Sequence, residues 1–203
     1  MNNATFFFNQ PKNEPVLSYA KGSKERELLS KELEKQYNQC IEIPIIINGK
    51  EIKTGNVSEV VMPTEHSHVL AKFHKADKET VQKAIESALE ARKKWENVHW
   101  IDRCSIMLRA AELLAGKYRY VINAATMLGQ GKNPFQAEID SACETIDFLR
   151  FNVHYASKIY AQQPLSDNSA INRLEYRGLE GFVYAISPFN FTSIACNLNI
   201  SPV

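Results

Sequence analysis

A Pro-aromatic-Asn turn lies near the end of the 203-residue sequence, between an apolar run and a helix-prone run. Pro188 fixes its own backbone and offers no N–H donor, and Phe189 supplies a flat apolar wall. Asn190 carries an amide that donates hydrogen bonds and does not titrate. Such a donor, held in place, suits an oxyanion that develops on a substrate carbonyl. A helix N-cap is the alternative role of Asn190, and the residue pattern alone leaves it open.

An acidic residue, Glu144, interrupts an aromatic stripe on a long helix-prone run. Phe148, Phe151 and Tyr155 follow it at helical spacing on the same face. An unpaired buried carboxylate is costly, so Glu144 needs either a partner or a functional role. Pairing with Arg150 or with a backbone amide is the structural alternative, and periodicity by itself favours that alternative.

Other reactive residue types lack the spacing of a site. The four cysteines form no C-x-x-C motif and are expected to be reduced thiols of an intracellular protein. Cys196 follows Asn190 by six residues, which directs it into helix packing. His66 and His68 have no third ligand nearby, so we predict no metal site. The GQGK run at 129–132 follows a helix and lacks the Ser or Thr of a phosphate loop, so we interpret it as helix capping.

Composition limits the possible partners and compartments. The net charge is +1, from 24 Lys+Arg and 23 Asp+Glu, so neither nucleic acid nor an acidic membrane surface is expected as a partner. No apolar run is long enough to span a bilayer. The first 19 residues have no basic region and no cleavage site of a secretory signal. Their lack of Arg weakens a mitochondrial presequence without excluding it, so cytoplasm and mitochondrial matrix both stay open.

The elements that must position the turn begin with an arm, a helix and strands. Residues 1–22 are expected to be extended, and a charged helix should follow from Ser23 as its N-cap. Asn48-Gly49 is a strong hairpin signal inside the run 41–54. Two further strands, at 58–63 and 69–75, would complete a β-meander.

Four helices and a last strand are predicted after the meander. Apolar residues at helical spacing place the helices at 78–95, 100–116, 117–131 and 134–160, with Asp77 and Asn133 as N-caps of the first and last. The run 171–178 alternates as a half-exposed strand, and 182–187 is an apolar strand of the buried parallel kind. Because that strand runs through a tight turn into a helix, the turn occupies the usual ligand position of an α/β sheet.

The run YRGLEGFVYAISPFNFT, at 176–192, resembles a motif of the aldehyde dehydrogenase superfamily, in which a Pro-aromatic-Asn corner ends the first strand of the dinucleotide domain. Phe189, where most of that superfamily has Trp, is similar to the delta-1-pyrroline-5-carboxylate dehydrogenase branch. So are the runs GQGK, QAEID, ETIDFLRFN and NEPVLSYAKGSKER. The resemblance extends from about Asn13 to the last residue.

The resemblance implies an α/β fold. An N-terminal β-meander and a helical layer would lead into the first strand of an incomplete Rossmann-like dinucleotide-binding domain. The expected divisions are 1–40, an arm and charged helix; 41–162, the meander and helices of the cofactor-binding domain; 163–180, an oligomerisation-type hairpin; and 181–203, the truncated start of the dinucleotide-binding sheet.

The resemblance also implies a chemistry. Members of this branch oxidise L-glutamate 5-semialdehyde, the open form of pyrroline-5-carboxylate, to L-glutamate with NAD. A cysteine forms a thiohemiacetal, hydride leaves to NAD, and water activated by a glutamate releases the acid. In that scheme Asn190 stabilises the oxyanion and Ser187 contacts the cofactor. Glu144 and Phe191 would face the substrate. The residues expected to line the dinucleotide groove are Ile186, Pro188 and Phe189.

Several parts of that scheme are expected beyond Val203. They are the catalytic cysteine, the general-base glutamate, a ribose-binding lysine and the glycine-bearing cofactor turn, so the chain alone is expected to be inactive. A homo-oligomer is implied for the complete protein, because relatives dimerise partly through a hairpin that INRLEYRG, at 171–178, resembles. The alternatives are a truncated, non-catalytic dimerisation or binding module, and a dehydrogenase relative with another aldehyde substrate.

Overall fold

The computed structural model describes residues 8–198, 200 and 201. A charged helix and a group of short strands come first, and helices make up most of the regular structure that follows. In chain order the elements are α1 (Lys24–Tyr37), β1 (Ile41–Ile43), β2 (Ile45–Ile47), β3 (Lys50–Ile52), β4 (Val57–Met62), β5 (Glu65–His74), α2 (Lys78–Trp95), α3 (Trp100–Ala115), α4 (Arg119–Gln130), α5 (Pro134–Ala137), a π-helical segment (Glu138–Cys143), α6 (Glu144–Ala161) and a 3₁₀ helix (Ile194–Leu198).

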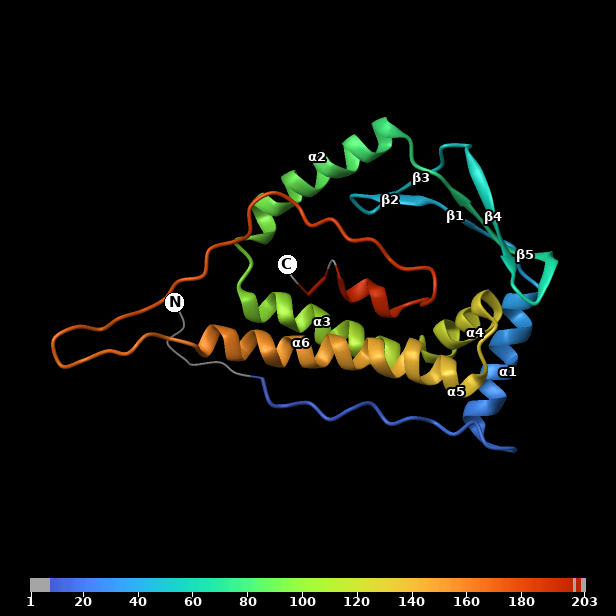
Figure 1. Ribbon diagram of the computed structural model, residues 1–203, viewed down its shortest axis with the longest axis horizontal. Coiled ribbons are helices and arrows are strands. Elements are labelled where there is room, and N and C mark those ends of the chain that lie inside the picture. Colours follow the sequence, from blue (N-terminus) through green and yellow to red (C-terminus); the bar gives the residue numbers. More distant parts are fainter. Residues whose placement is uncertain (1–7, 199, 202–203) are drawn as a thin grey trace.

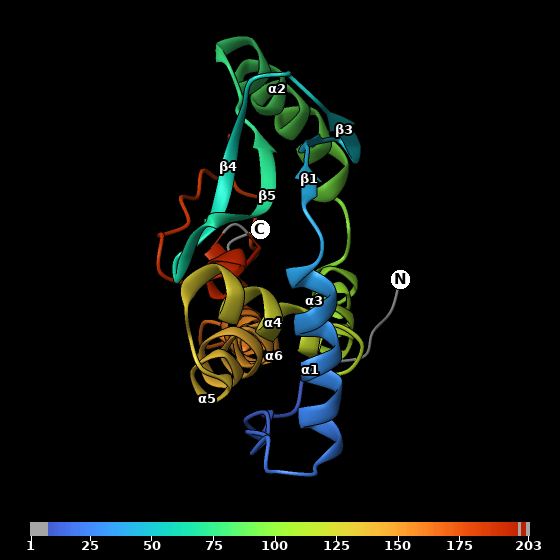
Figure 2. The same ribbon diagram turned by 90° about the vertical axis from the view of Figure 1, so that its right-hand side faces the viewer.

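The helices α1, α3, α4 and α6 form the base of the molecule (Figure 1). α3 packs along α6, and α1 packs on α4. Figure 2 shows α2 and the strands β4 and β5 on one side of this base. Small and branched apolar side chains fill the contact of α3 with α6 and the π-helical segment, including Ala111, Ala142, Ile146 and Leu149. The extended arm before α1, residues 8–22, runs along α6.

The Asn48-Gly49 hairpin is confirmed, and one strand pairs differently from a simple meander. Both turn residues have positive φ, 52° at Asn48 and 71° at Gly49, as the tight turn between β2 and β3 requires. β1 instead pairs parallel with β5, with Ile41 opposite Ala71. The strands therefore form two sheets, ordered β1-β5-β4 and β2-β3. Pro44 separates β1 from β2 and has no N–H to continue a ladder, so the chain changes sheets there.

The predicted helix N-caps are confirmed. Ser23, Asp77 and Asn133 each accept a side-chain hydrogen bond from the backbone N–H three residues later, over 3.3, 2.8 and 2.9 Å. Gln136 completes a capping box with Asn133. Gly131 ends α4 in the left-handed conformation, which confirms the capping interpretation of the GQGK run.

The fourth predicted helix is interrupted by the π-helical segment. A single α-helix over 134–160 is wrong there, because a wider turn moves the residues on its two sides out of a common 3.6-residue period. Phe135, on the near side of this segment, is 62% exposed, whereas Ile146 and Leu149, beyond it, are buried. Glu138 occupies a fully buried position instead.

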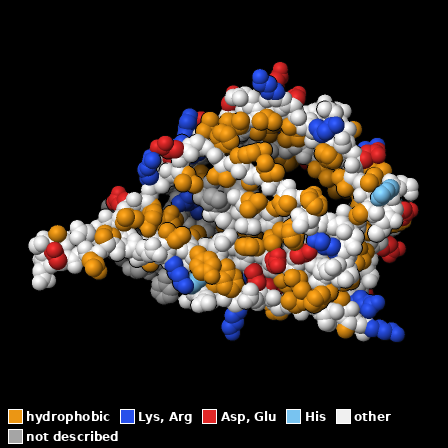
Figure 3. All heavy atoms as spheres, in the orientation of Figure 1, with side chains coloured by type: hydrophobic (Ala, Val, Ile, Leu, Met, Phe, Trp, Pro, Cys, Tyr) orange, Lys and Arg blue, Asp and Glu red, His pale blue; other side chains and the backbone are white. Residues whose placement is uncertain are grey.

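The predicted strands at 171–178 and 182–187 are not formed in this structure. The described residues after α6 contain no regular strand, and their one helix is the 3₁₀ turn. A parallel strand that is buried on both faces needs neighbouring strands for its N–H and C=O groups, and no described residue supplies them. The apolar side chains are correspondingly exposed, as Tyr184 and Ile186 are at 77% and 68%. Figure 3 shows further hydrophobic side chains at the surface along α2, where Val81 is 50% exposed.

Candidate functional site

The side-chain amide of Asn190 is free. It makes no hydrogen bond with any described residue, and Asn190 is exposed. The helix that follows begins only at Ile194, so Asn190 does not cap it. The N-cap alternative is therefore not the arrangement found here. An exposed amide at a turn remains available to a ligand oxygen.

The turn that carries this amide, residues 187–192 (the Asn190 turn), is held on the helical base through its backbone. Gln130 Nε2 donates to the Phe189 carbonyl over 3.4 Å. Lys132 Nζ donates to the Asn190 carbonyl over 2.8 Å and lies 4.6 Å from the centre of the Phe191 ring. The GQGK pattern predicted only a helix end and carried no signal of this role of Lys132.

A cluster of hydroxyl groups holds the residue after the turn. Ser193 Oγ donates to the Ser141 carbonyl over 2.8 Å and lies 2.9 Å from Thr145 Oγ1 and 3.1 Å from Ser141 Oγ. Ser141 Oγ also accepts from Thr126 Oγ1 over 2.9 Å. Ser141, Thr145 and Thr126 are fully buried. The only sequence signal for this cluster is a set of Ser and Thr residues at inward helical positions.

Glu144 lies at the start of α6 and is half-buried. It forms no hydrogen bond or ion pair with a described residue, and Arg150 is paired instead with Glu14, over 2.5 Å. Desolvation, and next the charge of Asp140, raise the pKa of Glu144, and Lys132 partly offsets this shift. The structural alternative of an Arg150 partner is therefore not observed. A half-buried carboxylate of raised pKa without a protein partner is typical of a functional position.

Glu138, for which helical periodicity carried no signal, is a fully buried acid. The Arg119 guanidinium pairs with it, and Tyr19 Oη and Asn123 Nδ2 donate to it over 2.6 and 2.8 Å. The Leu17 N–H donates to its other oxygen over 2.8 Å. Burial would raise the pKa of Glu138, but these contacts, Arg119 first, hold it below its usual range. Glu138 is a satisfied structural carboxylate.

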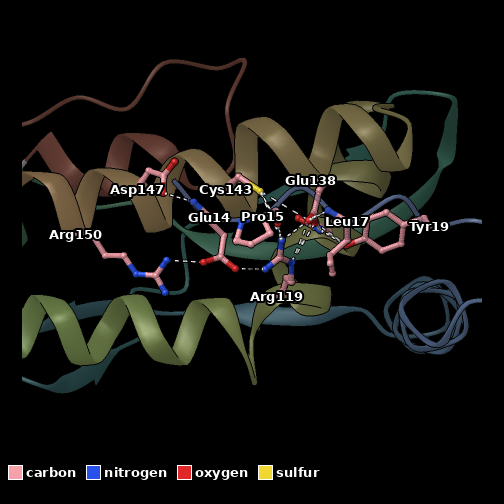
Figure 4. Close-up of polar contacts among 10 residues, drawn as sticks. Glu14, Pro15, Leu17, Tyr19, Arg119, Glu138, Cys143, Asp147 and Arg150 are labelled. Atoms are coloured by element: carbon pink, nitrogen blue, oxygen red, sulfur yellow. Dashed lines mark hydrogen bonds and ion pairs between the residues drawn. The ribbon is translucent and has the colours of Figure 1, made fainter. Parts of the chain in front are cut away.

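The same network ties the extended arm to the helices (Figure 4). Arg119 donates to Glu14 over 2.5 Å and to the Pro15 carbonyl over 2.7 Å. Arg150 reaches Glu14 from α6, and Asp147 accepts from the Glu14 N–H over 2.7 Å. The arm therefore lies against α4, the π-helical segment and α6 through charged contacts.

Three of the four cysteines, Cys104, Cys143 and Cys196, are poor candidates for a nucleophile. Burial raises the pKa of the Cys143 thiol to about 12, and burial likewise raises the pKa of Cys104. Cys196 is exposed as a residue, but desolvation of its thiol also raises its pKa. Because the thiolate is the reactive form, these shifts disfavour covalent catalysis by any of the three.

Metal ligands and membrane-crossing helices are both missing from the described part of the chain. Within residues 8–198, 200 and 201, no three His, Cys, Asp or Glu side chains could together hold a metal ion. His68 stacks on Tyr37 with ring centroids 4.1 Å apart and bonds the Tyr37 carbonyl. The helices of that same part are too short or too polar to cross a bilayer.

The site therefore combines a free amide at an anchored turn with a half-buried carboxylate, on a mixed α/β scaffold. The chain belongs to the aldehyde dehydrogenase family, whose sequence profile matches residues 51–203.

Two similar proteins share one description. The delta-1-pyrroline-5-carboxylate dehydrogenase of Agaricus bisporus is 52% identical over 201 residues, which are 98% of this chain and 37% of that protein. The human mitochondrial protein of the same description is 50% identical over 190 residues, which are 94% of this chain and 34% of its own length. The chain thus spans little more than a third of these relatives.

A relative of known structure has a closely similar backbone fold. The crystal structure of the Mycobacterium tuberculosis delta-pyrroline-5-carboxylate dehydrogenase bound with NAD matches with a TM-score of 0.95 and 45% identity. The match covers 98% of this chain and 37% of that one. It therefore includes most of the residues after α6, although these form no strand here.

Proposed function

We propose that this chain forms the N-terminal part of an NAD-dependent dehydrogenase that oxidises L-glutamate 5-semialdehyde to L-glutamate in proline degradation. The observation that carries the proposal is the free amide of Asn190, held on an anchored turn in a chain of the aldehyde dehydrogenase family. Asn190 donates to the oxygen of the reacting aldehyde as negative charge develops on it.

The residues around Asn190 fit a dinucleotide. Ile186 and Phe189 expose 68% and 96% of their surfaces, so they offer apolar contact to a flat ring system. The Ser187 hydroxyl is exposed and makes no hydrogen bond with a described residue. Pro188 restricts the backbone between Ser187 and Phe189. When bound, NAD supplies the hydride acceptor, and these residues orient it beside the aldehyde.

The experiment is a chimera in which residues 1–203 replace the matched region of the Agaricus bisporus relative, here called the completed enzyme. We expect it to form NADH, followed by absorbance, when pyrroline-5-carboxylate and NAD are added. The 203-residue chain alone should form none, because the nucleophile is expected in the other part. A folded completed enzyme without turnover, or turnover by the chain alone, would contradict the proposal.

Glu144 and Phe191 are proposed to face the substrate. Replacing Glu144 by glutamine in the completed enzyme should lower kcat/KM for glutamate semialdehyde roughly tenfold to a hundredfold, the value of one hydrogen bond to a charged group. The matched control is Glu112→Gln, which removes an exposed carboxylate paired with Arg109 on α3. Equal kinetics of the two variants would return Glu144 to a structural role.

The residues after α6 favour self-association as a second property. Leu165 and Ile171 are 92% and 78% exposed on a segment that extends away from the helices (Figure 1). We expect a homo-oligomer of the completed enzyme, measured by light scattering, and a shift toward monomer when both residues are replaced by serine. A mass unchanged by these replacements would exclude this segment as the interface.

The compartment is proposed as cytoplasm or mitochondrial matrix. The name of the human relative includes the word mitochondrial, and that of the Agaricus bisporus relative does not. Import of the labelled protein into isolated mitochondria distinguishes the two compartments.

A further inference from the structure

Lys132 lies where the helical base meets the Asn190 turn. Its Nζ donates to the Asn190 carbonyl over 2.8 Å and lies 2.6 Å from Asp140 Oδ2. The Lys132 and Asp140 side chains are 20% and 18% exposed, whereas those of the surface pair Lys31 and Glu27 are 68% and 63% exposed. The Lys132 contacts are therefore shielded from water and lose less strength to it.

These contacts act on one peptide unit. The carbonyl that Lys132 binds belongs to the unit that joins Asn190 to Phe191, so the ammonium restrains that plane directly. The ammonium also lies 4.6 Å from the Phe191 ring centre, which restrains the next side chain. Residues 187–192 belong to no helix or strand, so the backbone hydrogen bonds of regular structure do not supply this restraint.

We propose that Lys132 is a positioning residue for Asn190: by holding the Asn190 carbonyl, it sets the direction in which the side-chain amide meets the substrate oxygen. This inference rests on the proposed function. An oxyanion donor must be in place before charge develops, and a displacement of about 1 Å can cost about a hundredfold in rate. Asp140 supports Lys132 by supplying its counter-charge.

The first test needs no enzymatic activity and uses the 203-residue chain. NMR relaxation gives the order parameter of the Phe191 backbone N–H, which belongs to the restrained peptide unit. We expect Lys132→Met to lower it from about 0.85 to below about 0.6, the range of flexible backbone. Lys31→Met, at the exposed pair in α1, should leave it unchanged. An unaltered order parameter in Lys132→Met would overturn the inference.

The second test is a double-mutant cycle in the completed enzyme. Lys132→Met should lower kcat about tenfold to a hundredfold, with KM for NAD changed less than about twofold. In an Asn190→Ala background the same replacement should cost less than about twofold, because the residue it positions is gone. Equal costs in both backgrounds would show that Lys132 acts independently, for example by direct contact with the substrate, and would overturn the inference.

Lys132→Arg separates positioning from general loss of structure. Arginine keeps the charge and donors to Asp140 and the Asn190 carbonyl, so it should recover most of the rate. No recovery would count against the inference. If the parent chimera shows no turnover, the proposed function fails, while the NMR result still decides whether Lys132 holds the turn.

Discussion

Replacing Asn190 by alanine is expected to lower kcat of the completed enzyme by about a hundredfold to a thousandfold, the usual cost of one oxyanion donor. The amide makes no hydrogen bond with a described residue, so its removal breaks no contact of the fold. KM should change little, because the negative charge on the substrate oxygen exists only near the transition state. Steady-state rates of NADH formation measure both constants.

Asn38→Ala is the control for this prediction. Asn38 is exposed at the end of α1, and its amide donates to the Glu34 carbonyl over 2.8 Å. We expect near-parental kcat in that variant. A kcat for Asn190→Ala equal to that of the control would remove Asn190 from the reaction.

Removing the buried acid should have the largest effect on stability. Glu138→Ala is expected to lower the free energy of unfolding by about 3–5 kcal/mol, because it leaves the Arg119 charge buried without its main partner. Tyr19, Asn123 and the Leu17 N–H lose their acceptor in the same step. Urea denaturation of the 203-residue chain, followed by circular dichroism, gives the value. A loss no larger than that of Glu27→Ala, an exposed pair, would contradict the network.

The stabilisation that Glu138 contributes to the fold should depend on pH in a defined direction. The pKa of Glu138 is lowered in the folded protein, so its ionised form stabilises the fold at pH values above the ordinary carboxyl pKa. That stabilisation is lost as the pH falls through the lowered pKa. The stability difference between the parent chain and Glu138→Gln should therefore narrow on acidification. A constant difference across that range would show that the charge of Glu138 is not involved.

Local sequence signals were sufficient to predict part of this fold. The Asn48-Gly49 turn and the caps at Ser23, Asp77 and Asn133 depend on residues within three positions of each other, and the structure confirms them. The family resemblance is confirmed by the profile match and by the relatives. These features needed no knowledge of distant contacts.

The features of the structure that the sequence did not predict depend on long-range contacts. The π-helical segment places Glu138 against Arg119, 19 residues earlier, and against Tyr19, 119 residues earlier. Helical periodicity carries no information about partners this far away in the sequence. It therefore indicated Glu144 as the unusual acid and gave no sign that Glu138 is buried. The strand at 182–187 similarly depends on neighbours that the described residues do not include. The roles of Asn190, Ser187 and Phe191 remain proposals, since they concern ligands.

A crystal structure of the completed enzyme with NAD and L-glutamate bound tests most directly whether Asn190 is the oxyanion donor. We predict a side-chain carboxylate oxygen of glutamate about 2.7–3.1 Å from Asn190 Nδ2, the range of an oxyanion donor, with the Ser187 hydroxyl against the dinucleotide. An Asn190 amide turned back onto the N-terminus of the following helix, with the glutamate bound elsewhere, would contradict it.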